Sequence, residues 1–209
     1  MSDAENRVQW VYSSRDAEEL RRRYDEWAKE YDQDLERDFD WQGPSLAVDY
    51  FAKYVATSAH ILDAGAGTGL VGVELHKRGY HDLIAMDMSE GMLEEARKKG
   101  VYRQFDRMVL GEPLTYGDGE FDAVISVGVL TLGHAPAHSL DEMVRITRSG
   151  GHIVFSLRPD VYEQSGFREK QSALVDTGLW KVVEVSPEVR ILPKGEPEVA
   201  HQVWVYQVA

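Results

Sequence analysis

The 209-residue sequence contains no cysteine. Without cysteine the chain has no disulfide framework, no thiolate-bound metal and no cysteine nucleophile. The remaining metal-ligand types, histidines and acids, do not show the spacing of a ligand cluster, so we expect no metal cofactor. Any chemistry must therefore depend on the other polar side chains and on the backbone.

Long hydrophobic runs are also missing. No segment approaches the ~18 consecutive apolar residues that span a membrane. The first ten residues, MSDAENRVQW, lack the cationic and then apolar pattern of a signal peptide. Apolar residues nonetheless make up 43% of the chain, close to the average of globular proteins. We expect a single soluble domain over residues 1–209, cytoplasmic and without a membrane partner.

Positive charge is scarce. Lys and Arg number 23 against 36 Asp and Glu, which gives a net charge of −13. An acidic surface repels phosphate backbones, whereas nucleic-acid-binding proteins usually present a basic face. The one basic cluster, Arg21 to Arg23, stands among acids and is expected to be a solvated helix face. A small molecule is the favoured partner and nucleic acid is not.

Apolar runs and amphipathic segments alternate along the middle of the chain. A first helix is expected from an N-cap at Ser13 or Ser14 to about Gln33, and a second over residues 45–55. Strands are then expected at 60–64, 83–87, 107–111, 121–130 and 152–157, and helices at 69–77, 90–99 and 140–147. Such alternation predicts βαβ units with a parallel sheet and helices on both faces.

The last fifty residues have a different pattern. A helix is expected over residues 167–177, followed by two β-rich runs at 180–192 and 201–209. Two such runs joined by a turn-rich loop predict an antiparallel pair that closes the edge of the sheet.

The stretch HILDAGAGTGL, residues 60–70, follows the first strand of this series with three glycines, Gly65, Gly67 and Gly69. Glycine lets the backbone approach a ligand where a Cβ would clash, and the next helix offers free N–H donors. Gly67 to Gly72 also matches the dinucleotide fingerprint G-x-G-x-x-G, with an acid, Asp87, about 20 residues further on. This pattern fits a nicotinamide cofactor and S-adenosylmethionine equally.

Three features favour S-adenosylmethionine. Asp63 stands at the strand end, where it can orient the glycine loop or receive a cationic ammonium. Glu112 follows the expected third strand, suited to accept from an adenine amino group. No second domain is expected after the β-rich pair, so the chain would have no domain to bind the substrate of a hydride-transfer reaction. A nicotinamide-dependent reductase is the lesser alternative.

An ordered set of motifs resembles the class I S-adenosylmethionine-dependent methyltransferases. The set comprises DAGAGTG after the first strand, Asp87 after the second, FDAV at 121–124 and SGG at 149–151. The resemblance covers about residues 24–157, and the stretches YDEWAKEYDQD, LAVDYF and GMLEEA are most similar to a methyltransferase-like protein of that class. It implies a Rossmann-like fold with a mostly parallel seven-stranded sheet and an antiparallel C-terminal strand.

The resemblance also implies roles for individual residues. The methionine part of the cofactor would lie against Gly65, Ala66, Gly67 and Gly69. Apart from the resemblance, Tyr31 is expected to contact the methionine carboxylate or the substrate, and Asp63 keeps the two roles given above. Asp87 would bind the ribose hydroxyls, with Met88 and Met92 beside the adenine. The loop Glu112, Pro113, Leu114 would complete the adenine side, although many relatives carry Asp where this chain has Glu112. Val127 would approach the transferring methyl group.

Substrate residues are expected at the carboxyl ends of the strands, where ligands bind in open α/β sheets. His134 is the best candidate for a general base, because it follows the fourth strand and imidazole titrates near neutrality; His138 is a weaker one. Tyr24, Trp41 and Arg158 are candidate substrate contacts. Since alignment of the reactants alone can supply roughly 7–11 kcal/mol of the barrier, no base need be essential.

The expected function is in-line methyl transfer to an O, N or S atom of a small molecule. No N-P-P-Y or D-P-P-W stretch follows the fourth strand, which disfavours methylation of nucleobase amino groups. A catalytically silent S-adenosylmethionine-binding protein and a protein methyltransferase remain alternatives. We expect residues 1–57 to form a helical lid, 58–158 the cofactor-binding core, and 159–209 a C-terminal helix and β-hairpin, in a monomer or homodimer.

Overall fold

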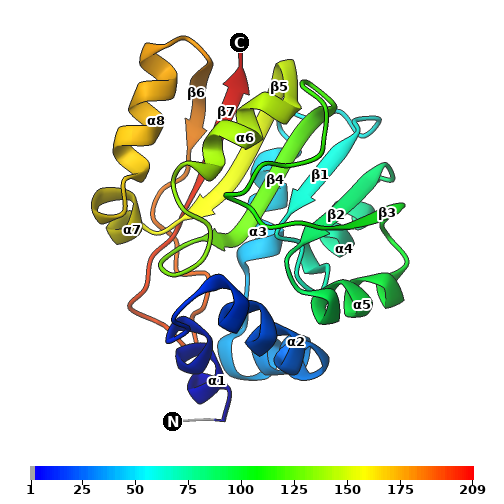
Figure 1. Ribbon diagram of the computed structural model, residues 1–209, viewed down its shortest axis with the longest axis vertical. Coiled ribbons are helices and arrows are strands. Elements are labelled where there is room, and N and C mark those ends of the chain that lie inside the picture. Colours follow the sequence, from blue (N-terminus) through cyan, green and yellow to red (C-terminus); the bar gives the residue numbers. More distant parts are fainter. Residues whose placement is uncertain (1–2) are drawn as a thin grey trace.

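The computed structural model describes residues 3–209, with side chains from residue 7 onward, so Met1 and Ser2 of the expected lid lie outside it. Seven strands form one mixed sheet in the order β3-β2-β1-β4-β5-β7-β6 (Figure 1). The strands are β1 (Ile61–Ala64), β2 (Leu83–Asp87), β3 (Gln104–Arg107), β4 (Phe121–Leu130), β5 (Thr147–Leu157), β6 (Trp180–Val185) and β7 (Gln202–Val208). β1 to β5 pair in parallel, and β7 runs antiparallel between β5 and β6. The predicted fold and the C-terminal antiparallel pair are confirmed.

Helices cover both faces of the sheet because its central strands bury side chains on both sides. Leu62 and Ile84 join one buried cluster, with α6 (Ser139–Ile146), α7 (Pro159–Gln164) and α8 (Phe167–Asp176). Ile61 and Leu83 join the other, with α3 (Gly43–Phe51), α4 (Leu70–Lys77) and α5 (Glu90–Lys99). Neighbouring residues of one strand therefore serve opposite faces, as expected for a doubly covered parallel sheet.

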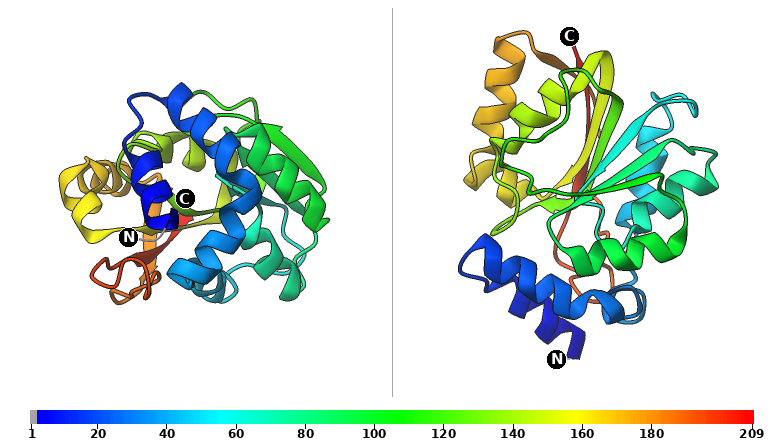
Figure 2. Two further views of the ribbon diagram at one scale, coloured as in Figure 1. Left: turned by 90° about the horizontal axis from the view of Figure 1, so that it is seen from below. Right: turned by 45° about the vertical axis from the view of Figure 1, so that its right-hand side comes forward.

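The N-terminal helices lie across one end of the sheet rather than on a face (Figures 1 and 2). They are α1 (Asp3–Tyr12), α2 (Ala17–Asp34) and a π-helical segment, η1 (Leu35–Phe39). α2 packs against α5, and α1 packs against α2. None of the helices described in residues 3–209 is both long and apolar enough to cross a membrane.

Several expected boundaries were wrong. The N-cap of α2 is Asp16, not Ser13 or Ser14, because its side chain accepts from the backbone N–H of Glu19. Ser13 and Ser14 instead bond backward to carbonyls at the end of α1, a helix that the sequence analysis missed together with α7. The other helices are close to their predicted ranges, and α5 is capped by Ser89 and Gly100.

The third strand is displaced from its expected position. It was expected at 107–111 but occupies Gln104–Arg107, pairing in parallel with β2. Residues 108–110 leave the sheet instead and turn along its carboxyl edge. This shift of about one strand length changes which residues reach the ligand site.

Candidate active site

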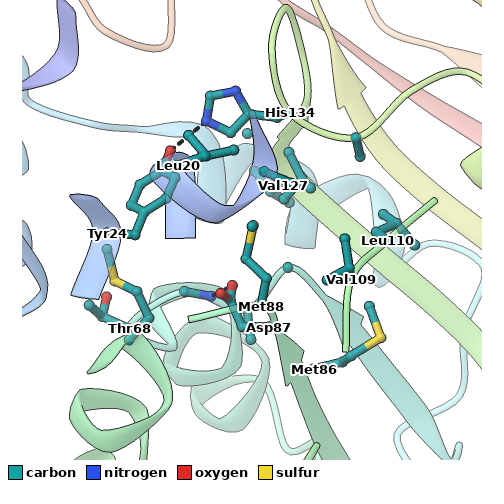
Figure 3. A pocket seen from close by; sticks show the side chains of 18 of the residues that line it. Leu20, Tyr24, Thr68, Met86, Asp87, Met88, Val109, Leu110, Val127 and His134 are labelled. Carbon is teal, nitrogen blue, oxygen red and sulfur yellow. Dashed lines mark hydrogen bonds between the residues drawn. The ribbon is translucent and has the colours of Figure 1, made fainter. Parts of the chain in front are cut away.

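A cavity of about 270 Å³ lies at the carboxyl ends of the parallel strands, beneath α2. Its walls come from the glycine loop after β1, the end of β2, residues 108–110, the end of β4 and the loop that carries His134 (Figure 3). This is the crevice in which open α/β sheets bind ligands. The described residues place one further, smaller chamber beside it.

The glycine loop is shaped for a ligand and held by Asp87. The N–H of Gly67 donates to Asp87 Oδ2 at 2.8 Å, and the N–H of Ser89 donates to Oδ1 at 2.9 Å. Gly67 has a φ of +54°, and a Cβ built on it meets no atom within 4 Å, so the backbone faces open cavity. Burial raises the pKa of Asp87, and the two N–H donors oppose that rise. An ionised carboxylate with remaining lone pairs fits the two hydroxyls of a ribose.

Most residues expected around the cofactor line this cavity. They are Tyr31, Gly65, Ala66, Gly67, Asp87, Met88, Met92 and Val127. Gly69 does not line it: Gly69 is the N-cap of α4 with a φ of +90°, and a Cβ there would strike Tyr102 and Ala96. Its role is to let α4 start close to α5.

Asp63 lies beneath the loop rather than on the cavity. Its carboxylate is fully buried and accepts a 2.6 Å bond from the hydroxyl of Tyr102, which in turn accepts from the N–H of Gly72. Of the two roles considered for Asp63, this geometry matches orientation of the glycine loop and helix, not direct contact with an ammonium. Burial raises the pKa of Asp63 to about 7.

The adenine-side prediction was wrong in position. Glu112 and Pro113 are exposed, and Leu114 is buried in the core, so none of the three lines the cavity. Met108, Val109 and Leu110 line it instead, because β3 ends four residues earlier than expected.

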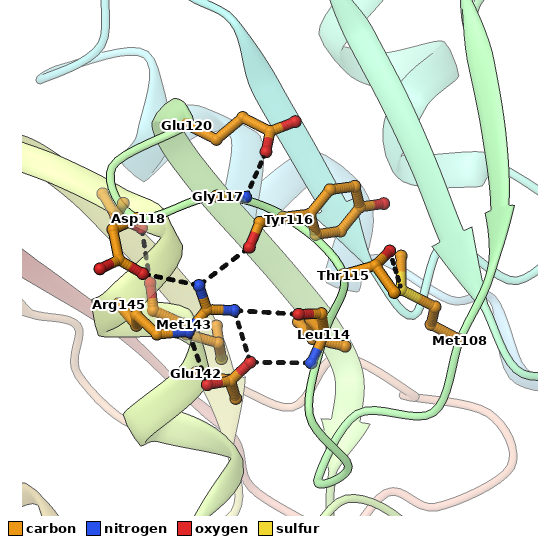
Figure 4. Close-up of polar contacts among 11 residues, drawn as sticks. Met108, Leu114, Thr115, Tyr116, Gly117, Asp118, Glu120, Glu142, Met143 and Arg145 are labelled. Carbon is orange, nitrogen blue, oxygen red and sulfur yellow. Dashed lines mark hydrogen bonds and ion pairs between the residues drawn. The ribbon is translucent and has the colours of Figure 1, made fainter.

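Two residues of α6, Glu142 and Arg145, form a clasp that holds the segment after Glu112 in place (Figure 4). Arg145 donates to the carbonyls of Leu114 and Tyr116 at 3.1 and 2.8 Å. Glu142 accepts from the N–H of Leu114 at 2.8 Å and pairs with Arg145 at 2.7 Å. The clasp fixes where the chain returns to the sheet at β4.

Tyr24 of α2 and His134 of the loop after β4 form a hydrogen-bonded pair across the cavity mouth (Figure 3). His134 Nδ1 lies 3.0 Å from the carbonyl oxygen of Leu132, which can only accept, so Nδ1 carries the hydrogen. Nε2 is then the acceptor for the Tyr24 hydroxyl, at 2.7 Å. Burial lowers the pKa of His134 and raises that of Tyr24, which keeps both groups neutral.

Comparison with known proteins identifies the family. The family model "Methyltransferase domain" matches residues 62–155. Methyltransferase-like protein 27 of Homo sapiens is 35% identical over 180 residues, which cover 82% of this chain and 72% of that protein. The chain belongs to the class I S-adenosylmethionine-dependent methyltransferases. Membership of this family removes the alternative of a nicotinamide-dependent reductase.

Two further comparisons are weaker in coverage or in identity. The demethylmenaquinone methyltransferase of Beutenbergia cavernae is 39% identical over 97 residues, which span 45% of this chain but only 38% of that enzyme. The solved structure of the cyclase SpnF has a TM-score of 0.70 at 14% identity and covers 93% of this chain and 97% of its own. At such identity the likeness shows the shared fold alone.

The second chamber of this methyltransferase contains the other predicted substrate residues. Arg158 lines it, but Nε and Nη2 of Arg158 are bound to Asp160 at 3.0 and 2.7 Å. Trp41 and Tyr24 line both the cavity and the chamber. His138 lies outside both, as the N-cap residue of α6 with Nε2 3.0 Å from the carbonyl of Gly111.

Two acids that fasten α2 over the site were missed. Asp25 accepts from the hydroxyl of Ser89 at 2.6 Å and from the N–H of Gly91 at 2.9 Å. Asp32 accepts from the hydroxyl of Thr68 at 2.5 Å and from Lys99 at 2.6 Å. In sequence these acids look like part of a solvated helix face, because their partners lie 36 to 67 residues away.

Proposed function

We propose that this protein transfers a methyl group from S-adenosylmethionine to an O, N or S atom of a small molecule. The observation that carries the proposal is the Tyr24–His134 pair on the same cavity as the glycine loop and Asp87. A proton acceptor thus lies beside the cavity that fits the cofactor.

The residues of the cavity fit S-adenosylmethionine in this chain. Asp87 would hold the ribose hydroxyls, the backbone of Gly65 to Gly67 the methionine part, and Met88 with Met108 to Leu110 the adenine. When bound there, S-adenosylmethionine supplies a methyl group made electrophilic by its sulfonium. The apolar side chains at the carboxyl end of β4, Val127 above all, exclude water from that region.

The Tyr24–His134 pair supplies a route for the acceptor's proton. Neutral His134 offers Nε2 as the acceptor, and the Tyr24 hydroxyl already points its hydrogen at that atom. The Tyr24 oxygen can therefore accept a proton from the substrate while the Tyr24 hydroxyl passes its own proton to His134 Nε2 in the same step. General base catalysis of this kind contributes about 10²–10⁴-fold where the nucleophile must lose a proton.

A small acceptor is favoured by how the site is covered. We propose that residues 1–57 act as a lid on the core of residues 58–158, since Asp25 and Asp32 of α2 bond to the loops that carry Ser89 and Thr68. Residues 159–209 complete the wall of the second chamber through Ile191, Leu192, Glu196 and His201. A protein substrate would have to displace this lid to present a side chain.

The experiment is a metabolite screen with deuterated S-adenosylmethionine. Protein and cofactor are incubated with fractionated cell extract, and products are sought that gain the mass of one labelled methyl group. A labelled small molecule formed only with active protein supports the proposal. Label found only on proteins would favour a protein methyltransferase, and tight cofactor binding without any labelled product would favour a silent binder.

A further inference from the structure

The chamber beside the cofactor cavity has a volume of about 70 Å³. It holds a few water molecules at most, and so a group of few heavy atoms. Tyr24, Tyr31, Trp41 and Gly128 line both spaces, so a group in the chamber is next to the cavity and beside the Tyr24 side chain. The position is that of the reacting end of a methyl acceptor.

Aromatic rings make up much of the chamber wall. They come from α1, α2, η1 and the segment that follows it: Tyr12, Tyr24, Trp27, Tyr31, Phe39 and Trp41. Ring faces attract cations through their quadrupole, most strongly for Trp, and aromatic walls of this kind recognise alkylammonium groups. They offer an anion no such attraction.

The charged residues that line the chamber, Arg158 and Glu196, sum to zero, and Asp160, which binds Arg158 from outside the lining, makes the local sum negative. Arg158 lines the chamber and carries one positive charge, but Asp160 holds two of its nitrogens and offsets that charge. Glu196 also lines the chamber and adds a second carboxylate. One cation and two carboxylates give a local formal charge of −1, and the whole chain carries −13. Both fields oppose an anionic ligand and favour a cationic one.

A buried histidine completes the polar set. His201 lines the chamber and is only 9% exposed, and its Nδ1 is buried without a hydrogen-bond partner among the described residues. Burial lowers the pKa of His201 to about 4, so the ring is neutral near pH 7. His201 therefore adds no positive charge to the chamber.

We infer that this chamber binds the ammonium group of a small aliphatic amine, which is the methyl acceptor. The inference rests on the proposed function and narrows its acceptor to nitrogen. An ammonium group brings N–H donors for the Glu196 carboxylate and a positive charge for the ring faces. Before the nitrogen can react, one proton passes from it to the Tyr24 oxygen while the Tyr24 proton passes to His134 Nε2. A neutral amine and an imidazolium result.

The test compares three probes of equal length: butylamine, butan-1-ol and butanoate. Fluorescence of Trp27 and Trp41, which line the chamber, reports binding to the full chain at constant ionic strength, with and without S-adenosylhomocysteine. Butylammonium is expected to bind at least tenfold more tightly than the alcohol or the carboxylate. Equal or tighter binding of butanoate overturns the inference, and this comparison needs no variant.

A matched pair of variants assigns the selectivity to the chamber. Glu196→Gln is expected to weaken butylammonium binding at least fivefold and to leave butan-1-ol unchanged. Glu163→Gln, an exposed acid of α7 that pairs with Arg168, should leave both within twofold. If Glu196→Gln behaves like the control, the chamber does not select the amine.

The two proposals fail in distinguishable ways. Binding of S-adenosylhomocysteine, measured by calorimetry in the same samples, reports the cofactor cavity alone. If it binds and butylammonium shows no preference, the acceptor inference is wrong while the methyltransferase proposal stands. If it does not bind, the proposed function is wrong whatever the amines do.

Discussion

Individual residues of the site differ in how far the sequence could place them. Asp87 was placed correctly because it ends a strongly apolar strand, and a strand end on the carboxyl edge faces the crevice. Glu112 was misplaced because its position depended on the boundary of a short, polar strand, β3, with the sequence QFDR. The pairing of Tyr24 with His134 could not be seen, since 110 residues separate them and only the docked α2 brings them together.

The protonation state of His134 gives a prediction that needs no substrate. The Tyr24 hydroxyl donates to the neutral imidazole, which favours the neutral form, and burial lowers the pKa of His134 further. Titration by NMR should therefore place the pKa of His134 below 6.5, and Tyr24→Phe should raise it. A His134 pKa at or above 6.5 in the wild type, or one that does not rise in Tyr24→Phe, would contradict the assigned pair.

Asp63 gives a prediction about stability. Burial raises its pKa from 3.8 to about 7, so the folded state holds a proton that the unfolded state releases. Its contribution to stability is complete below about pH 4 and is lost as the pH rises through about 7. A tenfold difference in proton affinity between the folded and unfolded states corresponds to about 1.4 kcal/mol. The unfolding free energy of wild type should thus fall relative to that of Asp63→Asn between pH 5 and 8, measured by urea denaturation. Parallel curves for the two proteins would argue against a raised pKa.

At the scale of elements, α2 precedes the glycine loop by about thirty residues in the sequence, yet it forms part of the cavity wall. Leu20, Tyr24 and Tyr31 line the cavity, and their spacing of four and seven residues places them on one face of α2. What the sequence did not indicate was the docking of the neighbouring flank by Asp25 and Asp32. Helical periodicity identifies an apolar face, but it does not distinguish a solvated acid from one that bonds to a loop distant in sequence.

Loosening this docking should weaken cofactor binding without unfolding the core. Asp32→Asn removes the charge that meets Lys99 and weakens the bond to Thr68, a residue of the cavity wall. We expect faster hydrogen exchange in α2 and a severalfold higher Kd for S-adenosylhomocysteine, with little change in exchange of β1 and β4. Glu26→Gln, an exposed change on the same helix, is the control. Unchanged exchange in α2 would show that Asp32 does not fasten it.

For the whole molecule, the order of the strands and of the helices other than α1 and α7 was predictable, whereas the shape of the site was not. Alternation of apolar strands and amphipathic helices, together with the right-handed βαβ rule, is enough to specify a doubly covered parallel sheet. The C-terminal pair was evident from its two β-rich runs. The second chamber, by contrast, is built from α1, α2, η1, the end of β4 and the segment of residues 191–201, which are distant in sequence and meet only in the folded chain.

The central claim is that the glycine loop and Asp87 form the S-adenosylmethionine site, and calorimetry with S-adenosylhomocysteine tests it most directly. Wild type should bind one equivalent per chain. Asp87→Asn should weaken binding by at least tenfold, because it loses both the ribose acceptor and the charge that holds the Gly67 N–H. Asp176→Asn, at the end of α8 and far from the cavity lining, should bind like wild type. Undiminished affinity in Asp87→Asn would contradict the account.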